Sequence, residues 1–200
     1  MGRKERREPR LAARLLEPGP VVLVTTHYRA QPNVMTAAWV IPLSLEPPRI
    51  GLAVHPSRLT HEFLTKGEFF ALNIVTIEYL PALHLCGLLS GRDTDKFTRA
   101  QLHPTDALET DVPVLEEAIA QIECGLAARL SLGDHDLFVG EVLAVAADSE
   151  LFGDRWLHLE EAPLAHHVGG EWYAALARVY RARLPDEEET EAEDHEASGR

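Results

Sequence analysis

The sequence predicts a mainly β protein with a few short helices between its strands. The clearest evidence is segment 118–130, in which apolar side chains occupy every second position and Gln121, Glu123 and Arg129 lie on the opposite face. A period of two is that of a strand with one buried face. A short polar turn then leads into 137–147, a second long apolar segment. The two segments are therefore expected to pair as a β-hairpin.

Three more strands are expected earlier in the chain. Residues 20–26 are rich in β-branched side chains, and 33–41 and 49–54 are further apolar segments. Pro42 and the proline pair that follows it lie between the last two segments. Because proline cannot donate a hydrogen bond to a β-ladder, these prolines are expected to separate two strands.

The helices are expected to be short. Ser57 can cap a helix that carries an apolar stripe, and Gly67 can end it. Residues 77–87 predict a second helix, again followed closely by glycine. Asp93 is expected to cap a third short helical turn.

The charge distribution predicts one folded domain between two charged extensions. A domain is expected over 15–184, after a basic N-terminal extension at 1–14 and before an acidic tail at 185–200. The tail has no large apolar side chain, so it cannot offset the entropy lost on ordering and is predicted to be disordered.

The net charge of −13 makes nucleic acids and anionic membranes unfavourable partners. No apolar run approaches the roughly 20 residues that span a bilayer, and no secretory signal follows the basic start. A cytoplasmic location is therefore expected. Two cysteines are too few for a disulfide framework or a four-thiolate metal site, and we expect no bound metal.

Several common catalytic motifs do not occur in the sequence. It contains no G-x-G-x-x-G, no Walker loop, no G-x-S-x-G and no H-E-x-x-H. Three other segments place polar groups where elements are expected to begin or end. In the first, 33–39, small residues alternate with Asn and Thr, so a flat ligand could approach the backbone. Close packing of that strand against its neighbour explains the same pattern.

The other two segments contain groups that suit a phosphate. Ser57, Arg58 and Thr60 lie at an expected helix start, where backbone N–H groups, hydroxyls and a guanidinium can bind an anion. Segment 90–97 is a glycine turn that leads to Lys96. An ordinary helix cap and a solvated loop are the alternative interpretations.

Together these motifs resemble those of the flavin reductase-like, FMN-binding split-barrel family, which includes the flavoredoxins. In order, they are N-x-M-T-A-A-W from Asn33, S-R-L-T from Ser57, G-E-F from Gly67 with Asn73, and S-G-R-D-x-D-K-F from Ser90. G-E-V from Gly140 and H-V-G-G-E-W-Y from His167 agree as well. The resemblance covers roughly residues 17–180.

The resemblance implies a Greek-key split β-barrel that forms a homodimer, with FMN in a groove at the subunit interface; FAD is the less favoured flavin. It also implies a role for each matching residue. The phosphate would be held by Ser57, Arg58, Thr60 and Lys96. The isoalloxazine would be lined by Asn33, Met35, Thr36, Ala37 and Trp39, with Thr36 near the reactive N5 as the catalytic candidate. The pocket would be completed by Asn73, Ser90, Gly91 and Phe97, with His167 and Tyr173 from the same or the other subunit.

The implied activity is that of an NAD(P)H:flavin oxidoreductase, in which hydride passes to N5 and the protein orients the two rings. Reduced flavin would then serve a partner monooxygenase or another acceptor protein. The alternatives are a flavoredoxin-like electron carrier that holds FMN tightly, and a flavin-binding module without turnover. A ferric iron site, known within the family, is disfavoured because Cys124 lies on the apolar face of its strand. The residues do not distinguish NADH from NADPH.

Overall fold

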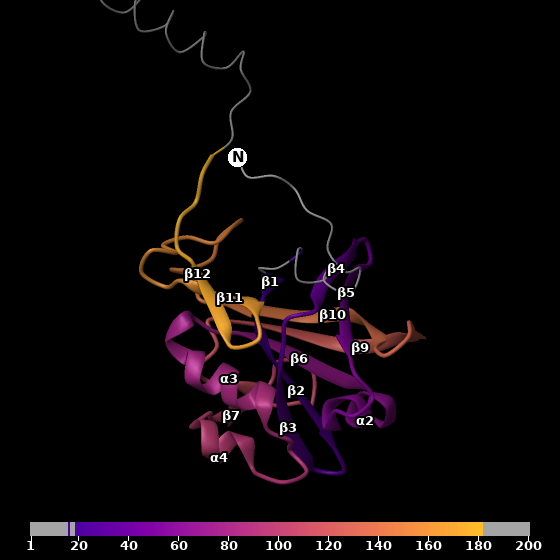
Figure 1. Cartoon of the computed structure of the whole chain (residues 1–200). Coiled ribbons are helices and arrows are strands. Elements are labelled where there is room, and N and C mark those ends of the chain that lie inside the picture. The colour runs from indigo at the N-terminus through magenta and orange to yellow at the C-terminus, as the bar shows by residue number, and fades with distance from the viewer. Residues whose placement is uncertain (1–15, 17–18, 182–200) are drawn as a thin grey trace, which may run out of the picture.

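A computed structural model describes Leu16 and residues 19–181, and its centre is a seven-stranded antiparallel sheet (Figure 1). The strand order is β3-β2-β6-β9-β10-β5-β4, so β3 and β4 lie at its two ends. The mainly β fold expected from the sequence is confirmed. The strands are β2 (Val22–Tyr28), β3 (Gln31–Ala37), β4 (Val40–Leu45), β5 (Pro48–Val54), β6 (Phe69–Ile74), β9 (Ala120–Ser131) and β10 (Asp136–Ala147).

Within residues 19–181, two small sheets and four short helices complete the fold. One small sheet joins β1 (Gly19–Pro20), β11 (Leu164–Gly169) and β12 (Trp172–Leu176), and the other pairs β7 (Pro104–Thr105) with β8 (Val114–Leu115). The helices are α2 (Leu59–Lys66), the 3-10 turn η2 (Ile77–Tyr79), α3 (Leu80–Leu88) and α4 (Lys96–Ala100). None of the helices described here is long and apolar enough to cross a membrane. The expected extensions 1–14 and 185–200 lie outside the described residues.

The expected β9–β10 hairpin is confirmed, with Asp136 opposite Ser131 at its turn end. The period-two pattern is wrong at more than one position, and one is Leu130, which was expected on the buried face but is 45% exposed. Glu123 was expected on the solvent face but is only 2% exposed. Its carboxylate accepts backbone N–H groups from Leu108, Glu109 and Thr110, which satisfies the buried charge and holds that loop against the sheet. These hydrogen bonds contribute to a lowered Glu123 pKa, although burial opposes them.

The expected strand 33–41 is in fact two strands. The chain leaves β3 at Ala37 and starts β4 at Val40, at the other end of the sheet order. Pro42 does not separate strands but lies inside β4. An edge strand tolerates proline because one side of its backbone needs no partner. The strands expected at 20–26 and 49–54 correspond to β2 and β5.

Two expected helix caps are wrong. The N-cap of α2 is Arg58, without a side-chain cap, while Ser57 bonds to the His55 ring. The N-cap of α4 is Asp95 rather than Asp93, and its carboxylate accepts the N–H groups of the next turn. Gly67 does end α2, and its N–H donates to the Phe63 carbonyl. Both helix starts lie beside β3.

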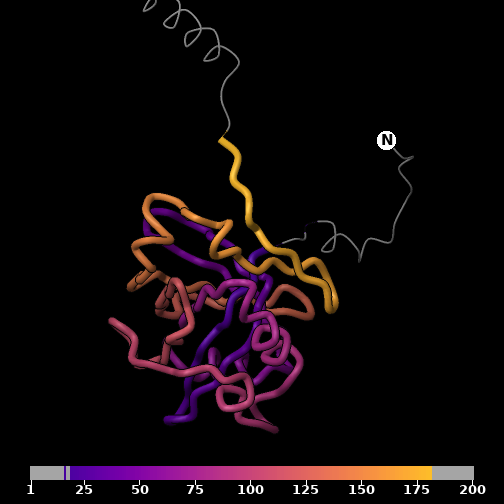
Figure 2. Tube along the Cα trace, turned by 90° about the vertical axis from the view of Figure 1, so that its left-hand side faces the viewer, coloured from indigo at the N-terminus to yellow at the C-terminus, as the bar shows by residue number. Residues whose placement is uncertain are grey.

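Edge strand β3 is the place where the helices meet the sheet. Contacts to β3 come from α2, α3 and α4, and α3 and α4 lie side by side. One buried cluster joins α3 and α4 to β2 and β3 through Leu23, Val34, Leu83 and Phe97. Figures 1 and 2 both place the β11–β12 hairpin next to α3. Side chains from β3, three helix ends and this hairpin are thereby brought close together.

Candidate functional site

Two adjoining cavities lie where β3 meets the helix ends, and Arg58 lines both. We call them the inner cavity, of about 80 Å³, and the open cavity, of about 250 Å³. The inner cavity is lined by Asn33, Met35, Ser57, Arg58, Leu59, Thr60, Leu89, Ser90, Gly91 and Lys96. The open cavity is lined by Val21, Thr36, Ala38, Arg58, His84, Gly87, Leu88, His167, Gly170 and Tyr173.

Lys96 supplies a buried cation to the inner cavity. It is 4% exposed, and its Nζ has one weak partner, the Cys86 carbonyl at 3.4 Å. No carboxylate in the described part of the chain forms an ion pair with it. Burial lowers the Lys96 pKa to about 8, and the nearby Arg58 guanidinium adds to the decrease. An anion bound here would relieve this cost, because it would stabilise the charged ammonium.

Asn33 and Gly91 also line this cavity. The Nδ2 of Asn33 donates to Thr60 Oγ1 at 2.8 Å. Its Oδ1 is buried without a hydrogen-bond partner. Such an orphaned buried oxygen is uncommon in native proteins and fits a ligand that brings a donor. The backbone of Gly91 passes directly over this oxygen.

Arg92 connects the 90–97 loop to α2. Its guanidinium donates to the Ser57 carbonyl at 2.9 Å and to Glu62 Oε2 at 3.0 Å. The Ser90 hydroxyl accepts the Arg92 backbone N–H. These contacts keep Ser90 and Gly91 beside the start of α2, which closes the inner cavity.

The open cavity has a hydroxyl on one wall and a ring cluster on the other. Thr36 Oγ1 donates to the Leu83 carbonyl at 2.5 Å, so its lone pairs remain for the cavity. Across from it, His84 Nδ1 lies 3.4 Å from the Tyr173 hydroxyl, and the His167 ring stands 5.3 Å from the Tyr173 ring. Burial raises the Tyr173 pKa above its ordinary value.

The structure brings eleven of the fifteen expected residues to these two cavities. Phe97 lies close by, 8% exposed, and lines a larger groove that adjoins the inner cavity. Three others lie elsewhere. Ala37 packs in the core between the sheet strands. Trp39 is 46% exposed, and its ring lies 4.7 Å from the His135 ring.

Asn73 is fully buried and its amide is used by the fold. It donates to the Leu23 carbonyl and to Thr25 Oγ1, and its Oδ1 accepts the Leu115 N–H. The amide thereby joins β6, β2 and β8, and the side chain holds strands together.

Eight of the lining residues escaped sequence reasoning, and they are Val21, Ala38, Leu59, His84, Gly87, Leu88, Leu89 and Gly170. His84 lies inside the helix expected at 77–87, where a single histidine gives no distinctive signal. Gly87 follows it on α3, and its carbonyl accepts from Arg58 Nη1 at 3.2 Å. Residues three apart lie on the same face of a helix, so the spacing predicts that Gly87 lies beside His84. This spacing is the one sequence signal that could have linked the two residues.

The two cysteines are core residues in this structure. Both are fully buried, and burial raises the pKa of Cys86 to about 11 and of Cys124 to about 12. Among the described residues, no group of three histidines, cysteines or carboxylates is arranged to hold a metal ion.

Comparisons with known proteins agree with this geometry. Residues 14–170 match the model of the flavin reductase like domain family. An uncharacterized protein of Pyrococcus abyssi is 34% identical over 169 residues, which are 84% of this chain and 97% of that protein.

Solved structures give the same result. The FMN-binding protein from Thermus thermophilus, solved with bound 1-cyclohex-2-enone, superimposes with a TM-score of 0.78 at 29% identity, over 92% of this chain and 100% of that one. Flavoredoxin of Desulfovibrio vulgaris superimposes with a TM-score of 0.75 at 25% identity, over 84% and 92%. The fold, the family match and these likenesses show that the chain belongs to the flavin reductase-like domain family, the FMN-binding split barrels that include the flavoredoxins.

Proposed function

We propose that this chain binds FMN, with the phosphate in the inner cavity. The observation that carries the proposal is the Lys96 ammonium, which is buried, weakly partnered and close to the Arg58 guanidinium. Two cations in a small cavity suit the nearly doubly charged phosphate monoester. Ser57, Thr60 and Ser90 add hydroxyls that can donate to its oxygens. The chain as a whole is acidic, so these local cations have to supply the attraction.

The isoalloxazine ring would lie in the open cavity, between β3 and the β11–β12 hairpin. Thr36 offers lone pairs from one wall, and Tyr173 and His84 offer polar groups from the other. Small neighbours such as Ala38 and Gly87 leave space for a flat ring. When bound, FMN would accept hydride from NAD(P)H at N5, so the protein needs no nucleophile of its own.

The activity that this arrangement favours is an NAD(P)H-dependent flavin oxidoreductase. Its task would be to fix the ring against β3 while leaving access for the nicotinamide. The likeness to a flavoredoxin supports a second candidate, an electron carrier that holds FMN tightly and exchanges electrons with a protein partner. A monooxygenase or another acceptor protein would consume the electrons in either case.

A homodimer is the assembly that the sheet surface favours. The outer face of β4 and β10 carries exposed Ile41, Leu43 and Leu143. Gly51 lies on β5, between β4 and β10. Because it has no side chain, the side chains of Leu43 and Leu137 can pack over it. Exposed apolar side chains grouped on neighbouring strands are typical of an interface. We propose that a second copy of the chain covers this face.

The dimer is tested by light scattering on the purified protein. Leu43→Lys is expected to halve the measured mass, while Leu108→Lys, on an exposed loop leucine elsewhere, is expected to leave it unchanged. A wild-type mass equal to one chain would contradict the proposal.

The cofactor is tested by the visible spectrum of the purified protein and by identifying any pigment that denaturation releases. We expect a flavin spectrum, with FMN released or taken up on addition. Anaerobic addition of NADH or NADPH then separates the two activities. Rapid bleaching supports the oxidoreductase, and a flavin that stays oxidised but accepts electrons from a reduced protein supports the carrier. A protein that stays colourless after FMN is added would refute the proposal.

A further inference from the structure

A pocket of about 480 Å³ lies at the end of the large sheet where β6 and β10 finish and β9 begins. Its lining residues come from three stretches of the chain, 76–79, 116–121 and 146–148. They are all different from the residues that line the inner and the open cavity. We call this space the acidic pocket, and the FMN site proposed above leaves it unassigned.

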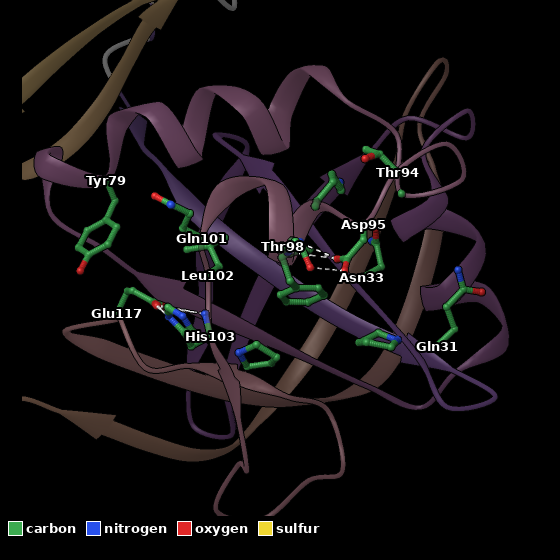
Figure 3. A pocket seen from close by; sticks show the side chains of 16 residues that line it. Gln31, Asn33, Tyr79, Thr94, Asp95, Thr98, Gln101, Leu102, His103 and Glu117 are labelled. Atoms are coloured by element: carbon green, nitrogen blue, oxygen red, sulfur yellow. Dashed lines mark hydrogen bonds and ion pairs between the residues drawn. The ribbon is translucent and has the colours of Figure 1, made fainter.

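Four carboxylates line the acidic pocket, while its described lining includes no lysine, arginine or histidine. They belong to Glu78, Glu116, Glu117 and Asp148. Glu117 is already paired with the ring and the backbone N–H of His103, in the larger groove beside the inner cavity (Figure 3). The other three form no ion pair within the part of the chain that the structure describes. The pocket therefore attracts a cation.

Thr76 adds a polar group without a partner. It lines the pocket and is 8% exposed, and its Oγ1 is buried with no hydrogen-bond partner. Thr76 is the N-cap residue of η2, a position where a threonine hydroxyl ordinarily accepts a backbone N–H, yet it makes no such bond. Buried hydroxyls are rarely left unpaired in native proteins. This one fits a ligand that brings a hydrogen-bond donor.

The rest of the lining is largely apolar. It consists mainly of Tyr79, Ala118, Ile119, Ala120, Ala146 and Ala147. No group of three histidines, cysteines or carboxylates among the described residues is arranged to hold a metal ion, so the carboxylates do not form a metal cage. A cation with an alkyl stem suits this lining better, because the stem buries apolar area while its charged ends stay with the carboxylates.

We propose that the acidic pocket binds an alkyl diamine, with its ammonium groups at the carboxylates and one N–H donated to Thr76 Oγ1. An ammonium group has three donors and no acceptor. It therefore matches a pocket whose free groups are carboxylates and one acceptor oxygen. Three carboxylates without a cationic partner attract two positive charges more strongly than one. The proposal is independent of the FMN site, since the two sites share no lining residue.

The test measures binding of 1,4-diaminobutane to the purified protein by calorimetry. Thr76→Val removes the hydroxyl and keeps the shape and the charge, and Glu116→Gln removes one carboxylate. Each is expected to weaken the diamine about tenfold or more, the scale of one hydrogen bond to a charged group. Glu68→Gln is the matched control, since it removes the same charge from an exposed residue at the opposite end of β6. It is expected to bind the diamine like wild type.

1-Aminobutane, which has one ammonium group, is expected to bind about tenfold or more weakly than the diamine. The Tm of each variant reports folding without any flavin, and Thr76→Val is expected not to lower it, because the lost hydroxyl has no partner. Equal weakening by Glu116→Gln and Glu68→Gln would reveal only a general attraction to an acidic chain and would overturn the proposal. Wild-type affinity in Thr76→Val would overturn it too, as would a protein that binds no diamine.

Discussion

Gly91 approaches Asn33 so closely that a Cβ atom at position 91 would lie 2.3 Å from Asn33 Oδ1. Real Cβ atoms do not make contacts this short, and Asn33 cannot retreat easily because its Nδ2 is bonded to Thr60. Any side chain at position 91 would therefore displace the Asn33 amide or the 90–97 loop. Both form the wall of the inner cavity.

Gly91→Ala is expected to weaken FMN binding about tenfold or more, because the cavity wall must move. Gly153→Ala is the matched control, since a Cβ there meets only Leu157 at 3.8 Å. Fluorescence titration of FMN into both variants measures the effect. FMN affinity that is equal in Gly91→Ala and wild type would show that this wall does not contact the cofactor.

Lys96 is expected to make FMN affinity depend on pH. Burial lowers its pKa to about 8 in the free protein, and a bound phosphate would raise it again because it favours the ammonium. The contribution of Lys96 to binding is therefore fully present below about pH 8. It is lost as the pH rises above that value, since the free protein then has to take up a proton in order to bind.

Lys96→Ala is expected to lose about 1–3 kcal/mol of FMN binding at pH 7 and to lose this pH dependence as well. Lys66→Ala is a suitable control, because that lysine pairs with Glu62 on the outside of α2. The measurement is the dissociation constant of FMN for wild type and both variants, between pH 6.5 and about 9.5. A pH profile that is identical in wild type and Lys96→Ala would remove Lys96 from the phosphate site.

The parts of the fold that could be predicted are those determined by local patterns. The hairpin of β9 and β10 follows from alternating side chains and a polar turn, and α2 follows from its apolar stripe and Gly67. The burial of Glu123 could not be predicted. Its compensation comes from three N–H groups of a loop at 108–110, and no local pattern links that loop to β9.

The same distinction applies to the candidate site. Ser57, Arg58 and Thr60 lie in one helix start, so their proximity follows from the sequence. Trp39 was expected to continue the strand of Thr36, but the chain ends β3 at Ala37 and turns to the far end of the sheet order. Its ring is carried to His135 instead. Where a strand breaks depends on its neighbours, which a single segment does not reveal.

Thr36 is expected to favour the reduced form of the flavin. Its hydroxyl proton is donated to the Leu83 carbonyl, so it can only accept a hydrogen bond from a ligand in the open cavity. Reduced flavin carries an N–H at N5 that can donate, whereas the oxidised ring has only a lone pair there. Thr36→Val should therefore weaken binding of reduced FMN more than binding of oxidised FMN.

The measurement is the midpoint potential of bound FMN. A tenfold loss in preference for the reduced form lowers the potential by about 30 mV for a two-electron couple. Thr36→Ser, which keeps the hydroxyl, is expected to restore the wild-type value. A potential that is the same in Thr36→Val and wild type would place N5 away from this hydroxyl.

The last prediction concerns stability and lies away from the cavities. Asp136, at the turn end of β10, is 4% exposed. Its carboxylate bonds to His61 Nε2 at 2.7 Å and to Arg129 Nε at 2.8 Å. The bond to His61, followed by other hydrogen bonds and the Arg129 charge, holds the Asp136 pKa well below its usual 3.8.

A lowered carboxylate pKa stabilises the folded state above the unfolded value of 3.8, and this contribution is lost as the pH falls below it. Asp136→Asn is expected to lower Tm at pH 7 and to flatten the acid limb of the stability curve. Asp134→Asn, on the exposed neighbour that pairs only with His135, serves as control and should change Tm little. The measurement is Tm from thermal melts between pH 7 and about 3. If Tm falls as steeply with decreasing pH in Asp136→Asn as in wild type, other carboxylates cause the loss of stability in acid.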